Sequence, residues 1–208
     1  LKNFVLKVCH ANQDWTMEAF IENTVENISK LEGNILCGVS GGIDSTVAAL
    51  LIQKAIGDRL KCVFVDNGLL RLGEAKEIEA MFAKNFKVDF TKIDGKEQFL
   101  SKLKGVADPE EKRKVIGEEF VRVFTDFAKD NGPFVWLAQG TLYPDVIESG
   151  VSKGPADVIK THHNVGGLPD WLHLKVLEPL RELYKDEVRN IAKILDVPEN
   201  LLIRHPFP

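Results

Sequence analysis

Cysteine and long apolar runs are scarce in this chain of 208 residues, and its 27 Lys and Arg residues are outnumbered by 31 Asp and Glu residues. Its three cysteines, Cys9, Cys37 and Cys62, lie far apart, form no metal-type pair and leave an odd number for disulfides, so we expect a reduced, cytoplasmic setting. The net charge is −4 and no basic tract stands out, which argues against a nucleic-acid binder. No apolar run approaches the length of a transmembrane helix, and the N-terminus does not read as a signal peptide, so we expect no membrane partner.

Strand and helix patterns alternate along the sequence. Short buried apolar runs predict strands at 34–39, 60–66, 87–94, 134–139 and 172–180, with helical patterns from 46 and at 73–85, 109–130 and 185–195. Thr16 precedes a further amphipathic run as a helix cap. Strands separated by helices imply right-handed crossovers, so the chain is predicted to be an α/β protein with a parallel sheet covered on both faces. In such sheets, ligands bind beyond the carboxyl ends of the strands.

The stretch VSGGIDST, residues 39–46, joins the first predicted strand to the helix that follows. Gly41 and Gly42 allow backbone conformations closed to other residues and let a ligand approach the main chain. With the hydroxyls of Ser40, Ser45 and Thr46, this turn suits a phosphate at the positive end of a helix dipole. The alternative is a tight turn with Asp44 or Ser45 as an ordinary N-cap. No Gly-Lys-Ser/Thr follows as in a Walker A loop, so positive charge must come from elsewhere.

Polar residues also follow the second and fourth predicted strands. Asp66 ends the second strand and could equally cap a turn, while Gly140 follows the fourth. A helix after Gly140 would hold Asp145 and Glu148 on one side, either at a site or at a solvated helix start. The irregular stretch 149–170 predicts a lid that carries Lys160 over phosphates, or else a polar loop with incidental charges.

Several segments carry a resemblance to a known family. SGGIDST resembles the pyrophosphate-binding loop of the N-type ATP pyrophosphatases, which have an adenine nucleotide alpha hydrolase-like fold. VDNGLLR, DPEEKRKVIGEEF, AQGTLYPDVIES, IKTHHNVGGLP, VLEPLRELYKDEVR and RHPFP are similar, in order and spacing, to the GMP synthetases within that group. LKNFVLKVC and DWTM resemble a junction with a glutamine amidotransferase domain, so residues 1–14 are expected to be a linker. Residues 15–208 would be the ATP pyrophosphatase domain, ending before a C-terminal dimerisation domain.

The resemblance implies a carbon–nitrogen ligase of purine nucleotide biosynthesis. Such an enzyme converts xanthosine monophosphate (XMP) to GMP through an adenyl-XMP intermediate and releases AMP and pyrophosphate. ATP and Mg²⁺ are the implied cofactors, ammonia would come from a glutaminase domain, and a homodimer would form through the missing C-terminal domain.

The same resemblance assigns residues to roles. Asp44 and Lys160 would act in catalysis, Asp44 and Asp145 would hold magnesium, and Arg113 would reach the XMP phosphate, although composition alone makes Arg113 a solvated helix charge. The implied ATP-binding residues are Ser40, Gly41, Gly42, Ile43, Asp44, Ser45, Thr46, Val65 and Gly140. NAD synthetase or another N-type ATP pyrophosphatase is the nearest enzymatic alternative, and a non-catalytic nucleotide-binding module is another.

Overall fold

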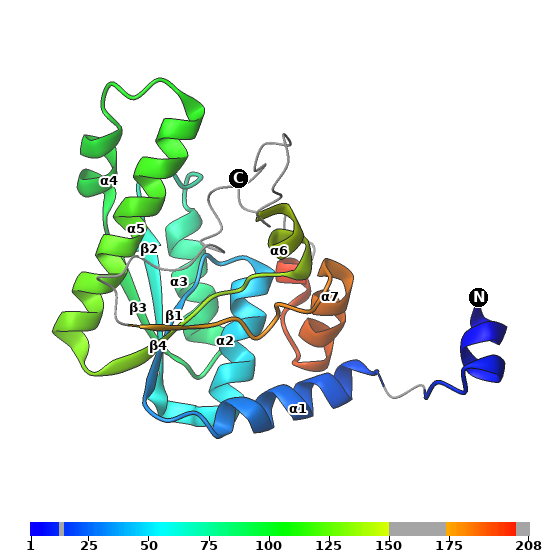
Figure 1. Ribbon diagram of the computed structural model, residues 1–208. Helices are drawn as coiled ribbons and strands as arrows, with labels where there is room; N and C mark the ends of the chain where they lie inside the picture. The colour runs from blue at the N-terminus through cyan, green and yellow to red at the C-terminus, as the bar shows by residue number, and fades with distance from the viewer. Residues whose placement is uncertain (13–14, 150–173, 203–208) are drawn as a thin grey trace.

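A parallel five-stranded sheet, in the order β3-β2-β1-β4-β5, forms the centre of the computed structural model (Figure 1). The structure describes residues 1–12, 15–149 and 174–202. Every pairing in this sheet is parallel, as the alternating pattern predicts. The strands are β1 (Asn34–Gly38), β2 (Leu60–Asp66), β3 (Asp89–Asp94), β4 (Phe134–Ala138) and β5 (Lys175–Leu177).

Helices precede, connect and follow these strands. Thr16 caps the first long helix as predicted, because its side chain accepts a hydrogen bond from Ala19 N at 3.1 Å. The eight-residue helix α4 was not predicted from the sequence. The helices are η1 (Phe4–Val8), α1 (Met17–Ser29), α2 (Ile43–Ile56), η2 (Gly57–Arg59), α3 (Glu74–Asn85), α4 (Lys96–Leu103), α5 (Pro109–Asn131), α6 (Tyr143–Ser149), α7 (Lys185–Ile194) and α8 (Glu199–Leu202).

The central strands β1 and β2 are buried on both faces of the sheet. Successive side chains of a strand point to opposite sides, so each of these strands contributes to two layers of the core. Ile35 and Cys37 of β1 pack with α2 and α3, whereas Leu36 between them packs with α4 and α5. The same alternation continues in β2, where Phe64 faces α3 and Val65 faces α4. A third cluster joins α1, α2 and α7 beside the sheet. This layering confirms the predicted α/β fold.

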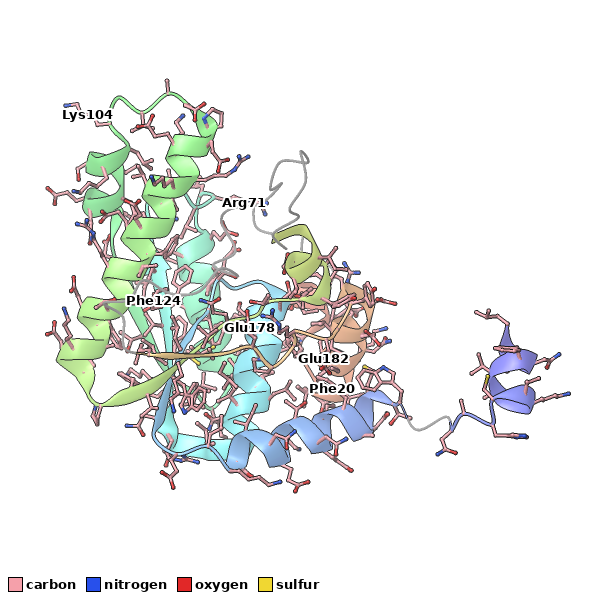
Figure 2. The ribbon with its side chains drawn as sticks, viewed as in Figure 1. Phe20, Arg71, Lys104, Phe124, Glu178 and Glu182 are labelled. Carbon is pink, nitrogen blue, oxygen red and sulfur yellow. The ribbon has the colours of Figure 1, made fainter. Side chains whose placement is uncertain are left out.

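The hairpin of α4 and α5 extends beyond the carboxyl ends of the strands (Figure 1). Lys104 lies at its tip and Phe124 near the sheet (Figure 2). The ring of Phe124 packs against the end of β1, because a Cβ added at Gly38 would lie 2.9 Å from it. The hairpin therefore stands as an arm on one side of the edge where ligands bind in such folds.

Candidate functional site

The loop between β1 and α2 is held together by its own hydroxyl groups. Ser40 N donates to Ser45 Oγ at 3.1 Å, and Ser45 Oγ donates to Gly42 O at the same distance. Thr46 Oγ1 also donates to Gly42 O, at 2.9 Å. Gly41 has a φ of +77°, a conformation that favours glycine. The N-cap of α2 is Gly42, so the expectation of Asp44 or Ser45 as an ordinary N-cap is wrong.

A glycine at the N-cap leaves the first backbone amides of α2 without a capping side chain. The first helical hydrogen bond runs from Thr46 N to Gly42 O at 3.2 Å. The N–H groups of Ile43, Asp44 and Ser45 precede it and have no partner within the helix. The side chain of Ile43 is buried in the core, so this residue can offer a ligand only its backbone. These amides stand at the positive end of a 14-residue helix, an arrangement that binds anions.

Gly140 brings the segment after β4 against this first turn. A Cβ at Gly140 would lie 2.9 Å from Ser45 N and 3.0 Å from the carbonyl carbon of Asp44. Glycine is needed there so that two backbones can meet, a packing reason distinct from the predicted approach of a nucleotide. Leu142 packs in the same core cluster as Ile43. The start of α2 and the segment after β4 are therefore packed directly against each other.

Asp44 is the only residue of the loop that carries a charge, and Lys185 is its partner. Lys185 Nζ lies 2.5 Å from Asp44 Oδ2, and the two side chains are 33% and 27% exposed. Asp44 Oδ1 is buried, and no group of the described residues hydrogen-bonds to it. Sequence reasoning missed Lys185, which begins α7. Its one local signal is a cation in the first turn of a helix, where the dipole disfavours it.

Asp145 lies in the first turn of α6, and its Oδ2 accepts a hydrogen bond from Leu142 N at 3.0 Å. Tyr143 N donates to Leu183 O at 3.0 Å, and the rings of Tyr143 and Tyr184 meet edge to face at 5.4 Å. These contacts fix the start of α6 beside the start of α7. The side chain of Glu148 lies outside the described residues.

A magnesium ion fits this set of side chains in one respect. Within the described ranges, no three His, Cys, Asp or Glu side chains are grouped to hold a metal ion. Mg²⁺ does not need such a group, since it is commonly bound by one or two carboxylates together with phosphate oxygens and water. The buried Oδ1 of Asp44 is an oxygen that still lacks a partner in the described structure. Asp44 is therefore the described residue best suited to this ion.

Asp66 is the last residue of β2, and its side chain contacts the turn that follows. Its Oδ1 accepts from Gly68 N at 3.2 Å, and its Oδ2 lies 3.0 Å from Lys96 Nζ. The interpretation as a turn cap is confirmed. The hydrogen bond and charge of Asp66, followed by the charge of Asp94, raise the pKa of Lys96.

The backbone of Val65 faces a gap in the sheet ladder. The pairing of β1 with β2 ends at Gly38 and Val63, whereas β2 pairs with β3 as far as Asp66 and Asp94. Val39 N donates to Val63 O on the β1 side, and Gly95 N donates to Asp66 O on the other side. Because successive backbone groups alternate in direction, the N–H and C=O of Val65 point past the end of β1.

Two predicted residues are not brought to this loop by the described structure. Arg113 lies on the arm and pairs with Glu110 at 2.9 Å. Between Arg113 and Phe124, α5 rises by about 16 Å. Lys160 and the predicted lid from residue 150 to 170 lie outside the described residues. None of the described helices has both the length and the apolar character needed to cross a membrane.

Comparisons with known proteins identify the family. The sequence model of NAD synthase matches residues 15–123, just over half of the chain. The glutamine-hydrolysing GMP synthases of Paraburkholderia phymatum and Finegoldia magna are 57% and 55% identical over the whole chain. The chain spans 40% and 41% of the length of these relatives.

Solved structures share the fold at much lower identity. The NMN synthetase of Francisella tularensis matches 93% of this chain and 76% of its own, with a TM-score of 0.68 and 19% identity. The NH3-dependent NAD synthetase of Campylobacter jejuni, solved with a nitrate ion, matches 90% of this chain and 76% of its own, with a TM-score of 0.69 and 14% identity. These neighbours confirm the adenine nucleotide alpha hydrolase-like fold. The chain belongs to the NAD synthase family of ATP pyrophosphatases, and along its whole length it is similar to glutamine-hydrolysing GMP synthases.

Proposed function

We propose that this chain is the ATP pyrophosphatase part of a GMP synthase. The observation that carries the proposal is the identity of 57% to a curated GMP synthase over the full chain. The sequence identity to the solved NAD and NMN synthetases is 14–19%, which supports the fold alone. The GMP synthase reaction is therefore favoured over the NAD synthetase alternative.

The proposed reaction has two steps. An oxygen of XMP attacks the α-phosphorus of ATP while the base gives up a ring N–H proton to solvent. The bond to the bridging oxygen of the β-phosphate breaks, and pyrophosphate leaves with that electron pair. Ammonia then adds to the activated carbon of adenyl-XMP, AMP leaves, and the added nitrogen loses its extra proton to give GMP. Negative charge develops on pyrophosphate in the first step, so the protein must stabilise that charge.

The start of α2 is the described feature best suited to that task. The N–H groups of Ile43, Asp44 and Ser45, with residues 40–42 and the hydroxyl groups of the loop, would hold the β- and γ-phosphates. Asp44 and Asp145 would hold magnesium, which neutralises phosphate charge when bound. The backbone of Val65 would contact adenine. Lys160 over the phosphates and Arg113 at the XMP phosphate remain part of the proposal.

The linker, partners and location are also proposals. Residues 1–14 would join this domain to a glutamine amidotransferase domain that supplies ammonia. No residue of η1 is buried, and η1 stands apart from the other helices (Figure 1), as expected of a linker. A homodimer would form through residues after 208. A cytoplasmic setting agrees with three cysteines that are all free.

The test is the substrate dependence of ATP cleavage in the full-length protein. With ammonium as nitrogen donor, we expect AMP and pyrophosphate to form from ATP and Mg²⁺ only when XMP is added, with GMP produced in equal amount. Deamido-NAD, the substrate of an NAD synthetase, is the matched control. Cleavage that depends on deamido-NAD would favour the alternative, and nucleotide binding without any turnover would favour a non-catalytic module.

A further inference from the structure

We infer that Lys185 exchanges partners: it pairs with Asp44 when the site is empty and with the triphosphate when nucleotide and metal are bound. This inference rests on the proposed function, because it needs a nucleotide at the start of α2. It assigns a second cation to the site, from a helix 141 residues away in sequence. That cation lies within the described structure, unlike the lysine of the predicted lid.

The position of Lys185 is not explained by the needs of its own helix. A cation in the first turn of α7 is disfavoured by the helix dipole. The cap of α7 does not use Lys185, since Tyr184 N donates to Glu187 Oε2 at 2.8 Å. The first turn already contains Asp186 and Glu187, which suit the dipole. The ion pair with Asp44, at 2.5 Å, is therefore the contact in the described structure that accounts for the position of this side chain.

The carboxylate of Asp44 can accept more hydrogen bonds than Lys185 donates to it. An ionised carboxylate has about four acceptor positions, and Lys185 lies on Oδ2 alone. Oδ1 is buried and has no partner among the described residues. A carboxylate oxygen in this state favours a further cation, because an unpaired buried polar atom is costly. Asp44 is thus held by one cation while it retains an oxygen for another.

A metal ion bound to Asp44 would weaken the ion pair between Asp44 and Lys185. Two cations on one carboxylate repel each other, and the repulsion is stronger at a partly buried site than in water. The phosphates that come with the metal place negative charge at the adjacent amides of α2. A lysine has a flexible four-carbon stem, so its ammonium can cross a few ångströms without backbone movement. We expect Lys185 to leave Asp44 for a phosphate oxygen, where it stabilises the leaving pyrophosphate.

The exchange gives Lys185 opposite effects on two binding reactions. It competes with a metal ion for Asp44 when no nucleotide is present. It assists binding when the metal arrives together with ATP. A residue that only fixes the position of Asp44 would favour both reactions or neither.

The experiment measures both reactions by calorimetry in the full-length protein and in Lys185→Met. Mn²⁺ alone is the probe of Asp44, and Mg²⁺ with ATP is the probe of the occupied site. We expect Lys185→Met to bind Mn²⁺ alone roughly three- to fivefold more tightly, as expected for loss of one partly exposed ion pair. We expect it to bind MgATP on the order of tenfold more weakly, as expected for loss of a charged hydrogen bond.

Two further variants control for folding and for charge. Lys193→Met removes an exposed lysine from the same helix and should change neither affinity. Lys185→Arg keeps the charge and should recover part of the MgATP affinity while leaving Mn²⁺ binding at the wild-type level, and it keeps the test valid if the methionine variant does not fold.

Equal or weaker Mn²⁺ binding by Lys185→Met would overturn the exchange, and so would unchanged MgATP affinity. If the wild-type protein binds MgATP and makes GMP, such results refute the inference alone. If the wild-type protein does not bind MgATP, the proposed function falls together with it.

Discussion

Replacing Gly140 by alanine should separate two backbones that now touch. The new Cβ would lie 2.9 Å from Ser45 N and 3.0 Å from the carbonyl carbon of Asp44. Both neighbours are main-chain atoms, so no side-chain rotation can relieve the contact. Overpacking of this kind typically costs about 1–3 kcal/mol. In a chain of this size, 1 kcal/mol corresponds to about 2–4 °C, so we expect Tm to fall by roughly 2–12 °C.

The same change should weaken nucleotide binding, because it displaces the first amides of α2. Gly117→Ala is the matched control. Gly117 lies inside α5, and a Cβ there would meet nothing within 4 Å. Alanine in a helix interior is favoured over glycine by about 1 kcal/mol, so the control should raise Tm by a few degrees. Thermal unfolding followed by circular dichroism and ATP calorimetry measure both effects. An unchanged Tm and ATP affinity in Gly140→Ala would refute the proposed contact.

Three other predictions concern charge and thiols. Asp44→Asn keeps the shape of the side chain but deletes its charge, so steady-state pyrophosphate release should fall on the order of a hundredfold or more, and near-normal turnover would remove Asp44 from the site. Titration with a thiol reagent should modify Cys9 alone in the native protein and all three cysteines after denaturation, because Cys37 and Cys62 are buried. The hydrogen bond with Cys37, followed by burial, also raises the pKa of the Cys62 thiol. Fast modification of more than one thiol in the native protein would contradict this prediction. The raised pKa of Lys96 means that its pairing with Asp66 contributes stability below the ordinary lysine value of 10.5 and loses it as pH rises through the higher, folded value. Lys96→Met should therefore have a lower Tm than wild type at pH 8, and the difference should vanish at strongly alkaline pH; a difference that stays constant would show that the charge of Lys96 plays no part.

The sequence predicts the elements whose apolar pattern is long or continuous. The strand Leu60–Asp66 is found with the predicted bounds, and the helix Pro109–Asn131 differs from its prediction by one residue. Helix α4 escaped prediction because it has eight residues and a single buried side chain, Phe99. Such a segment forms a helix through tertiary packing more than through its own pattern.

The candidate site was predictable only where its residues are close in sequence. The loop of residues 40–46 is predicted as a phosphate site from its glycines and hydroxyls, which are close together in the sequence. The contact between Lys185 and Asp44 joins two helices 141 residues apart, and no local pattern reports it. The packing role of Gly140 has no local signal either, because the backbone that Gly140 contacts belongs to the distant helix α2. Asp66 was ambiguous in the sequence because a buried turn cap and a ligand contact use the same residue type.

The early end of the β1–β2 ladder has a consequence for base selectivity. At Val65 a donor and an acceptor of the main chain face the place where β1 would have continued. Under the proposed function, a purine base that lies there takes the place of the next residue of β1 and forms hydrogen bonds with the peptide groups of Val65. Adenine presents an amino donor beside a ring acceptor, whereas guanine presents a carbonyl beside a ring N–H, so fixed peptide groups that match one mismatch the other. A different side chain at position 65 does not change this main-chain donor and acceptor. A preference for ATP over GTP would therefore persist through substitutions that preserve the strand.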